Sequence, residues 1–150
     1  MLDQIVGETG EAVLICGHTH IPWQKVIQGK LIFNPGAVCG PLDGTLGAQY
    51  ALLQWDGHRW QVEHHRVEYD LEPLRRSFCE NGLLEAGSYL ARSFLLSIES
   101  GRNVAEDFLA HAKRLKNEAG IENTEYIPDD IWERAGQSFD WGEAGGSIGR

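Results

Sequence analysis

His18 and His20 are the residues of this chain best suited to chemistry, because a single threonine separates them and an apolar run precedes them. That run, Ala12–Cys16, contains β-branched residues and is followed by Gly17, a pattern typical of a buried strand that ends in a tight turn. Alternate residues of an extended chain lie on one side, about 6.5 Å apart at ~3.3 Å per residue. The sequence therefore predicts that the two imidazoles converge on one metal ion, or bind one each of two ions about 3.5–4 Å apart.

A His-x-His pair by itself more often marks a solvated strand end than a metal site. The residues around the pair must therefore distinguish these two interpretations. Here Ile21 and Pro22 follow the pair, then two short predicted strands, and then the turn sequence Asn-Pro-Gly-Ala-Val at 34–38. This arrangement resembles the C-terminal half of bacterial calcineurin-like metallophosphoesterases. In that family Gly-His-x-His is the last metal motif, and an Asn-Pro-Gly-Ser/Ala-Val turn usually follows it. The likeness covers about residues 1–70.

The resemblance implies a fold, an activity and a set of site residues. The fold is of the α+β class, a layered α-β-β-α sandwich present only as its C-terminal half, with appended C-terminal helices. The activity is hydrolysis of phosphoric esters, as a phosphoesterase or phosphodiesterase acting on a small phosphorylated substrate. The cofactors are two divalent metal ions, with Mn, Fe, Zn and Ni indistinguishable. His18 would bind one ion and His20 the other, and the turn residues near the site would be Gly17, Asn34, Pro35 and Gly36.

The other metal ligands of the family have no counterpart in this chain. They come from an Asp-x-His, a Gly-Asp-x-x-Asp, a Gly-Asn-His and a lone His, all earlier than the Gly-His-x-His motif. Only sixteen residues precede Gly17, no Gly-Asp or Gly-Asn dipeptide occurs, and Leu2–Val6 resembles the tail of a helix. We therefore expect a truncated family member: a fragment, a misassigned gene start, or a half completed by a second polypeptide. Because two imidazoles alone hold a divalent ion poorly, we expect this chain by itself to be inactive, and its catalytic residues stay unidentified.

The remaining histidines favour structural interpretations. Asp56-Gly57-His58 fits Asp-x-His, but Asp-Gly between the predicted strands 50–55 and 60–67 is a strong hairpin signal. His64 and His65 are adjacent in a strand, so their side chains should face opposite ways and cannot share one ion. His111 lies on the polar side of a predicted helix, which indicates a solvated surface role.

Composition narrows the class of protein. With 42% hydrophobic and 23% charged residues the chain is an ordinary soluble one, and no apolar run approaches the roughly 20 residues that cross a bilayer. A net charge of −9 argues against sequence-independent nucleic-acid binding, although bound metal ions would reverse the local sign for a phosphorylated substrate. Cys16, Cys39 and Cys79 form an odd set that we interpret as buried free thiols in a reducing cytoplasm. The expected location is therefore cytoplasmic, away from membranes.

The pattern of the chain changes near residue 70. Residues 1–70 indicate strands and turns, including strands at 23–27 and 30–33 joined by a Gln-Gly turn. Residues 71–141 indicate a helical extension, and 142–150 a disordered tail. We predict four helices. The first has Pro73 in its first turn, and the second is capped by Ser88 and ends before Gly101. The third is capped by Asn103 and ends at Gly120, and the fourth begins with Asp129 and Asp130. The aromatic core is expected from Phe94, Phe108, Trp132, Phe139 and Trp141.

Two alternatives to an enzyme stay open at this point. The chain can be a catalytically incomplete fragment or assembly partner that needs a missing N-terminal half or forms a homo-oligomer. Half of a sandwich leaves strand edges and an apolar sheet face uncovered, which predicts oligomers or poor solubility. Alternatively, the helices of 71–140 form a module that recognises another protein.

Overall fold

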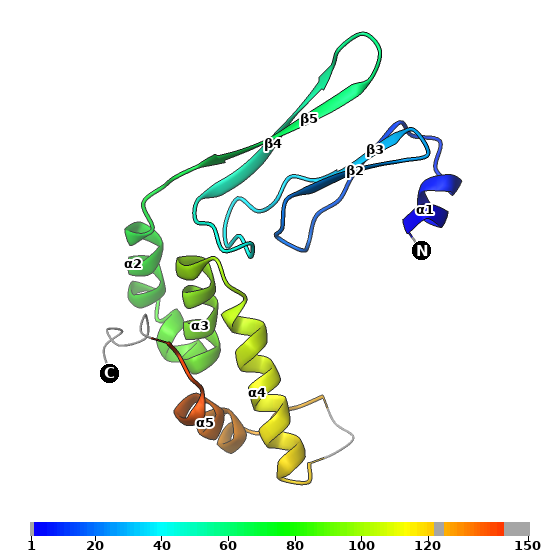
Figure 1. Cartoon of the computed structure of the whole chain (residues 1–150). Helices are drawn as coiled ribbons and strands as arrows, with labels where there is room; N and C mark the ends of the chain where they lie inside the picture. Colours follow the sequence, from blue (N-terminus) through cyan, green and yellow to red (C-terminus); the bar gives the residue numbers. More distant parts are fainter. Residues whose placement is uncertain (1, 122–124, 143–150) are drawn as a thin grey trace. The chain divides into compact units, whose positions relative to one another are not determined.

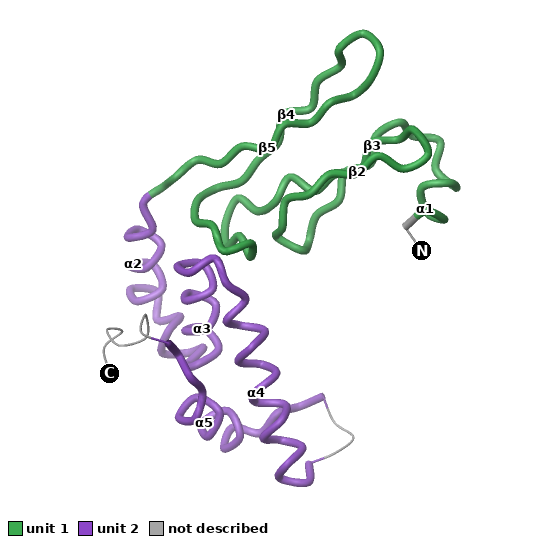
Figure 2. Tube along the Cα trace, in the orientation of Figure 1, with its two compact units in different colours: residues 1–69 green, residues 70–150 purple. Residues whose placement is uncertain are grey.

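The chain consists of two compact units, residues 1–69 and 70–150, drawn in green and purple in Figure 2. The structure is a computed structural model that describes residues 2–121 and 125–142. The tail 142–150, predicted to be disordered, lies outside the described residues except for Gly142. None of the helices in the described ranges is both long and apolar enough to cross a membrane.

Unit 1 begins with a helix and a three-stranded sheet, which are blue in Figure 1. Its elements are α1 (Leu2–Glu8), β1 (Val13–Ile15), β2 (Trp23–Ile27) and β3 (Lys30–Asn34). The strand order is β1-β3-β2, with β1 parallel and β2 antiparallel to β3. Gln28 and Gly29 join β2 to β3 with φ values of 51° and 76°, as a type I′ turn requires. The hairpin predicted from Gln-Gly is thereby confirmed.

A second hairpin completes the strands of unit 1. β4 (Ala48–Trp55) and β5 (Trp60–Val67) pair antiparallel, from Ala48 opposite Val67 to Trp55 opposite Trp60. At the tip, the Asp56 carboxylate accepts hydrogen bonds from the backbone N–H groups of His58 and Arg59, both at 2.8 Å. These bonds, that of Arg59 first, lower the pKa of Asp56. The Asp-x-His sequence is therefore a hairpin turn, as predicted.

The apolar core of unit 1 is small. It is formed by Val6 of α1, Ile27 of β2 and Ile32 of β3, which are buried together on one face of the sheet. Leu31 and Phe33, on the other face of β3, are also buried, but many large side chains of this unit stay exposed. They include Ile5, Ile15, Ile21, Val26, Val38, Leu46, Leu52, Trp55, Trp60 and Val67.

Unit 2 is entirely helical in its described residues, and its elements run from green to orange in Figure 1. They are α2 (Glu72–Glu80), α3 (Leu83–Ser100), α4 (Val104–Glu118) and α5 (Asp129–Ser138). Pro73 lies in the first turn of α2, and the Asn103 side chain caps α4 by accepting from the Glu106 N–H at 3.3 Å. Gly101 ends α3 with a φ of 68°, so these predicted helix boundaries are confirmed.

The helix boundary predicted at Ser88 is present as a kink. Ser88 has φ 46° and ψ −134°, outside the helical region, and the helical stretch that ends at Ser100 follows it directly. What we did not predict is the helical stretch 83–87 before it, so that α3 begins at Leu83. The next residue, Tyr89, packs into the helical unit: its ring stacks on Trp141 and fits closely against Gly136, where there is no room for a side chain.

The core of unit 2 is aromatic and centres on Phe108, which is completely buried. The rings of Trp132, Phe139 and Trp141 lie within 5.1–5.8 Å of it, as predicted. Phe94 is a correction: its side chain is 52% exposed and lines an apolar groove instead of joining this core. The neighbouring α3 positions Leu95 and Leu96 are buried instead.

Asp129 and Asp130 open α5 from its first turn, and both are exposed. Neither caps the helix, because Pro128 occupies the N-cap position and no side-chain hydrogen bond is made there. Their negative charge therefore acts only on the helix dipole.

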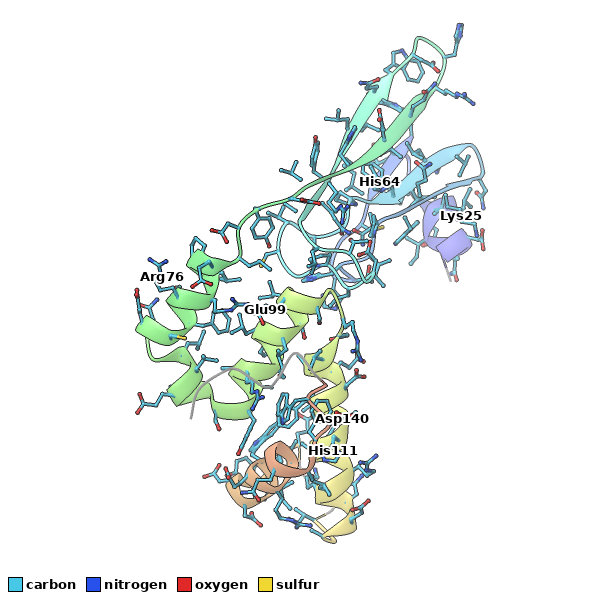
Figure 3. All side chains as sticks on the ribbon, turned by 60° about the vertical axis from the view of Figure 1, so that its left-hand side comes forward. Lys25, His64, Arg76, Glu99, His111 and Asp140 are labelled. Carbon is cyan, nitrogen blue, oxygen red and sulfur yellow. The ribbon has the colours of Figure 1, made fainter. Side chains whose placement is uncertain are left out.

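His111 does more than the solvated role we predicted. It is half-buried between α4 and α5, with its ring 5.6 Å from that of Phe139 (Figure 3). It accepts a hydrogen bond from Arg114 at Nδ1 (2.7 Å) and donates from Nε2 to the Ser138 hydroxyl (2.8 Å). Burial, followed by the Arg114 charge, lowers the pKa of His111.

Candidate metal site

His18 and His20 lie on a tight loop, residues 17–20, that follows β1 and is called the histidine loop below. Both side chains are exposed. The backbone here is not extended as we predicted, since both histidines have left-handed φ values, 75° and 57°. The Thr19 N–H donates to the Gly17 carbonyl at 2.9 Å, which closes the turn. Histidine is among the few residues that tolerate this backbone region, so the sequence permits the turn but does not reveal it.

The ring of His20 is held in one tautomer. Its Nδ1 lies 2.8 Å from the Gly40 carbonyl oxygen, and because a carbonyl only accepts, Nδ1 carries the hydrogen. The Nε2 lone pair is then available to bind an ion. The backbone of His20 is held as well, because its carbonyl accepts from the Leu42 N–H at 3.1 Å.

Asn34, the last residue of β3, ties the histidine loop to the following turn. It is completely buried. Its Nδ2 donates to the Gly17 carbonyl (3.3 Å) and to the Thr19 hydroxyl (3.0 Å). Its Oδ1 accepts from the Gly36 N–H at 2.9 Å. Sequence reasoning recognised Asn34 as a turn residue but missed the two bonds to the histidine loop.

The loop from 35 to 47 is ordered by polar contacts. Gln49 is buried; its Oε1 accepts from the Ala37 N–H (3.0 Å), and its Nε2 donates to the Asp43 carboxylate (2.8 Å). Burial tends to raise the pKa of Asp43, but hydrogen bonds from Thr45 and Gln49 outweigh it and the pKa is lowered. Gly36 has a φ of 91°, and a Cβ there would lie 2.2 Å from Gln49 Oε1, so this position requires glycine.

His64 and His65 have different environments, as their alternation in β5 predicts. His64 donates from Nε2 to the Asn34 backbone carbonyl at 2.8 Å and lies between the hairpin and the sheet (Figure 3). The His65 ring instead stacks on Tyr50 at 5.1 Å, with its Nε2 3.5 Å from the Glu63 carboxylate. The two rings therefore do not form a ligand pair.

The cysteines are free, as predicted, but only Cys16 is even partly buried; Cys39 and Cys79 are exposed. Within the ranges that the structure describes, no three His, Cys, Asp or Glu side chains are grouped closely enough to hold an ion. The candidate metal ligands on this chain are thus the two histidines of the histidine loop.

Comparison with known proteins shows what this region is similar to. Residues 2–58 match the calcineurin-like phosphoesterase superfamily domain. This region is similar to part of a calcineurin-like phosphoesterase domain. The match includes both motifs that carried the resemblance, the histidine loop and the turn that begins at Asn34. The recognition made from the sequence is therefore confirmed.

Two similar proteins extend this finding. An uncharacterized protein of Methanocaldococcus jannaschii is 30% identical over 88 residues, which is 49% of this chain and 35% of that protein. The crystal structure of a metallophosphoesterase from Sphaerobacter thermophilus aligns with a TM-score of 0.54 and 26% identity, covering 67% of this chain and 47% of that one. The chain thus spans about a third of the first protein and about half of the second.

These matches confirm the predicted fold class. The mixed α+β arrangement of small sheets and helices corresponds to part of a metallophosphoesterase fold. Calcineurin-like phosphoesterases generally use divalent metal ions.

Proposed function

We propose that this chain is part of a metal-dependent hydrolase of phosphoric esters, and that His18 and His20 each contribute a ligand to a two-metal site. The observation that carries the proposal is the hydrogen bond from His20 Nδ1 to the Gly40 carbonyl. Histidines that bind metal ions in proteins almost always donate their other ring N–H to a carbonyl or carboxylate, which orients the ring and fixes the tautomer. His20 is prepared in this way.

The backbone of the histidine loop supports the same assignment. Two non-glycine residues with left-handed φ within a three-residue stretch are uncommon, and such strain concentrates at binding sites. Both imidazoles are exposed, so an ion and its remaining ligands have access to them. The residues present thus fit part of a metal site. The further ligands would come from outside the residues that the structure describes.

The role of these histidines is to hold ions and not to transfer protons. Divalent ions, when bound, neutralise the charge of a phosphoryl group and lower the pKa of water. His20 supplies Nε2 as the ligand atom, since its Nδ1 hydrogen is held by the Gly40 carbonyl. Asn34 and Gly40 keep the loop in place. The substrate we infer is a small phosphorylated molecule, because the charge of −9 disfavours a nucleic-acid backbone.

The test is metal binding by the full chain. We expect isothermal titration calorimetry to detect weak binding of Mn²⁺ or Zn²⁺, and His18→Ala and His20→Ala each to weaken it at least about tenfold. His58→Ala is the matched control, because His58 is an exposed histidine on a hairpin of the same unit. Hydrolysis of a chromogenic phosphodiester with added Mn²⁺ is measured in parallel on the complete protein, where both variants should lose activity. Unchanged affinity of the chain and unchanged hydrolysis by the complete protein in both histidine variants would contradict the proposal.

A second candidate function is that of an assembly partner whose site is completed by another polypeptide or a second copy. Two observations favour it. The described part of the chain offers no group of three ligands, and β1, which leads into the histidine loop, pairs with a described strand on one edge only. Ile15 on that strand is 64% exposed. Sedimentation velocity tests this candidate, and a monomer that unfolds in one sharp transition would argue against it.

A further inference from the structure

We propose that Asn34 and His64 form a brace that holds the histidine loop in its metal-binding conformation, so that metal affinity depends on two residues that bind no metal themselves. The inference rests on the proposed function and deepens it. It assigns a positioning role to His64, the one histidine of unit 1 that donates to the backbone of the candidate site without being a ligand.

The backbone of the histidine loop needs support from its surroundings. A left-handed backbone is unfavourable for any residue with a side chain, and the histidine loop contains two such residues. The contacts of His20 with Gly40 and Leu42 hold one end of the loop. Among the described residues the His18 ring has no equivalent contact, so its position depends on the backbone that carries it.

The side chain of Asn34 supplies that backbone support. Its amide group has two N–H donors, and they are used at Gly17 and Thr19, the residues immediately before the two histidines. Its oxygen accepts from Gly36. Because the Asn34 amide is completely buried and both its nitrogen and its oxygen form hydrogen bonds, it has one favourable orientation. That orientation fixes the conformation of the histidine loop.

His64 links Asn34, and through it the loop, to the hairpin. The Asn34 carbonyl accepts the Nε2–H of His64 at 2.8 Å, from β5, thirty residues away in sequence. The His64 ring also contacts Phe33 edge-on, at 6.3 Å between centroids. Since its Nε2 is committed as a donor, that atom has no lone pair for an ion. His64 therefore fixes the strand end from which Asn34 reaches the loop.

The experiment uses the full chain and two readouts. Zn²⁺ affinity is measured by calorimetry, and amide hydrogen exchange of the metal-free chain is measured at Leu42, which donates to His20. We expect His64→Leu to weaken Zn²⁺ binding by about tenfold and to accelerate exchange at Leu42, while strand amides near Ile32 stay protected. His64→Gln should restore both, because a glutamine amide can donate to the same carbonyl.

Three further variants make the test decisive. His65→Leu is the matched control and should leave both readouts unchanged, since His65 faces Tyr50. Asn34→Asp keeps the acceptor for Gly36 but loses the donors to the loop, and should behave like His64→Leu. Thr19→Val removes only the hydroxyl that accepts from Asn34. If the other variants do not fold, this milder variant still tests the brace.

The outcomes separate the two proposals. Wild-type affinity in His64→Leu, Asn34→Asp and Thr19→Val, with unchanged exchange at Leu42, would overturn the brace and leave the metal assignment standing. Absence of Zn²⁺ binding by the wild-type chain would overturn the proposed function. The exchange readout would then still decide whether Asn34 and His64 order the loop.

Discussion

The two units of this chain reach an ordered structure by different means. Unit 2 is organised by a completely buried aromatic residue, Phe108, with other rings packed around it. Unit 1 has a smaller apolar core, and one of its most deeply buried side chains is the amide of Asn34. Apolar packing therefore organises unit 2, whereas the histidine loop of unit 1 is held by hydrogen bonds that favour one arrangement.

This comparison predicts that the largest loss of stability comes from the core of unit 2. Phe108→Ala removes the ring that Trp132, Phe139 and Trp141 contact, and should lower the free energy of unfolding of unit 2 by about 3–5 kcal/mol. Urea unfolding of the full chain, followed by tryptophan fluorescence and circular dichroism, measures the change.

The matched control is Phe94→Ala, which truncates an exposed phenylalanine of the same unit. It should cost far less than Phe108→Ala. Equal losses in the two variants would mean that Phe108 is not the centre of the core.

The next largest effect should come from a buried polar residue of unit 1. Gln49→Ala leaves the Ala37 N–H and the Asp43 carboxylate without their glutamine partner, and should destabilise unit 1 by about 1–3 kcal/mol. Thermal unfolding monitored at unit 1 amides measures the loss. Gln54→Ala, an exposed glutamine on the same strand, should change little. A similar loss of stability in both variants would mean that the hydrogen bonds of Gln49 contribute nothing to the stability of unit 1.

A smaller effect of opposite sign is expected in the histidine loop. Glycine adopts a left-handed backbone without steric cost, so His18→Gly should stabilise the metal-free chain by up to about 1 kcal/mol while weakening metal binding. Thermal unfolding and calorimetry with Zn²⁺ give the two measurements. His58→Gly, at an exposed histidine without a left-handed φ, should instead destabilise the chain slightly. Loss of stability in His18→Gly would mean that the backbone there is not strained.

The smallest effect is the pH dependence of unit 2. The pKa of His111 is lowered in the folded chain by burial and by Arg114, so the unfolded chain binds the proton more readily. The contribution of this residue to stability is complete above the unfolded-state pKa, about 6.5, and declines as the pH falls through it toward the lower folded-state value. NMR titration of the His111 ring should give a pKa below the ordinary value, and His111→Gln should flatten the pH dependence. A raised pKa would contradict the contacts described for this ring.

Sequence reasoning succeeded where short-range chemistry decides the structure. The turn at Gln28 and Gly29, the Asp56 hairpin and the Asn103 cap each depend on residues within a few positions of one another. The family was also recognisable from two short motifs within residues 2–58.

It failed where distant residues decide. The close fit of Tyr89 against Gly136 joins residues far apart in the sequence, and the exposure of Phe94 depends on which face of α3 is buried. The hydrogen bond from His64 to Asn34 joins residues thirty positions apart. No local pattern marks such pairs, because alternation and spacing report which face a side chain occupies and not which partner it meets.

The break at Ser88 has a mechanical consequence for α3. A continuous helix transmits bending along its whole length, but an interruption makes a joint that divides it into a short arm, 83–87, and a long arm, 89–100. The long arm carries the buried residues Ala91, Leu95 and Leu96 and is anchored by them. Helix α2, which leads into the short arm, is tied across this joint to the long arm, because Arg75 Nε donates to the Glu99 carboxylate at 2.8 Å. This ion pair opposes bending at the joint.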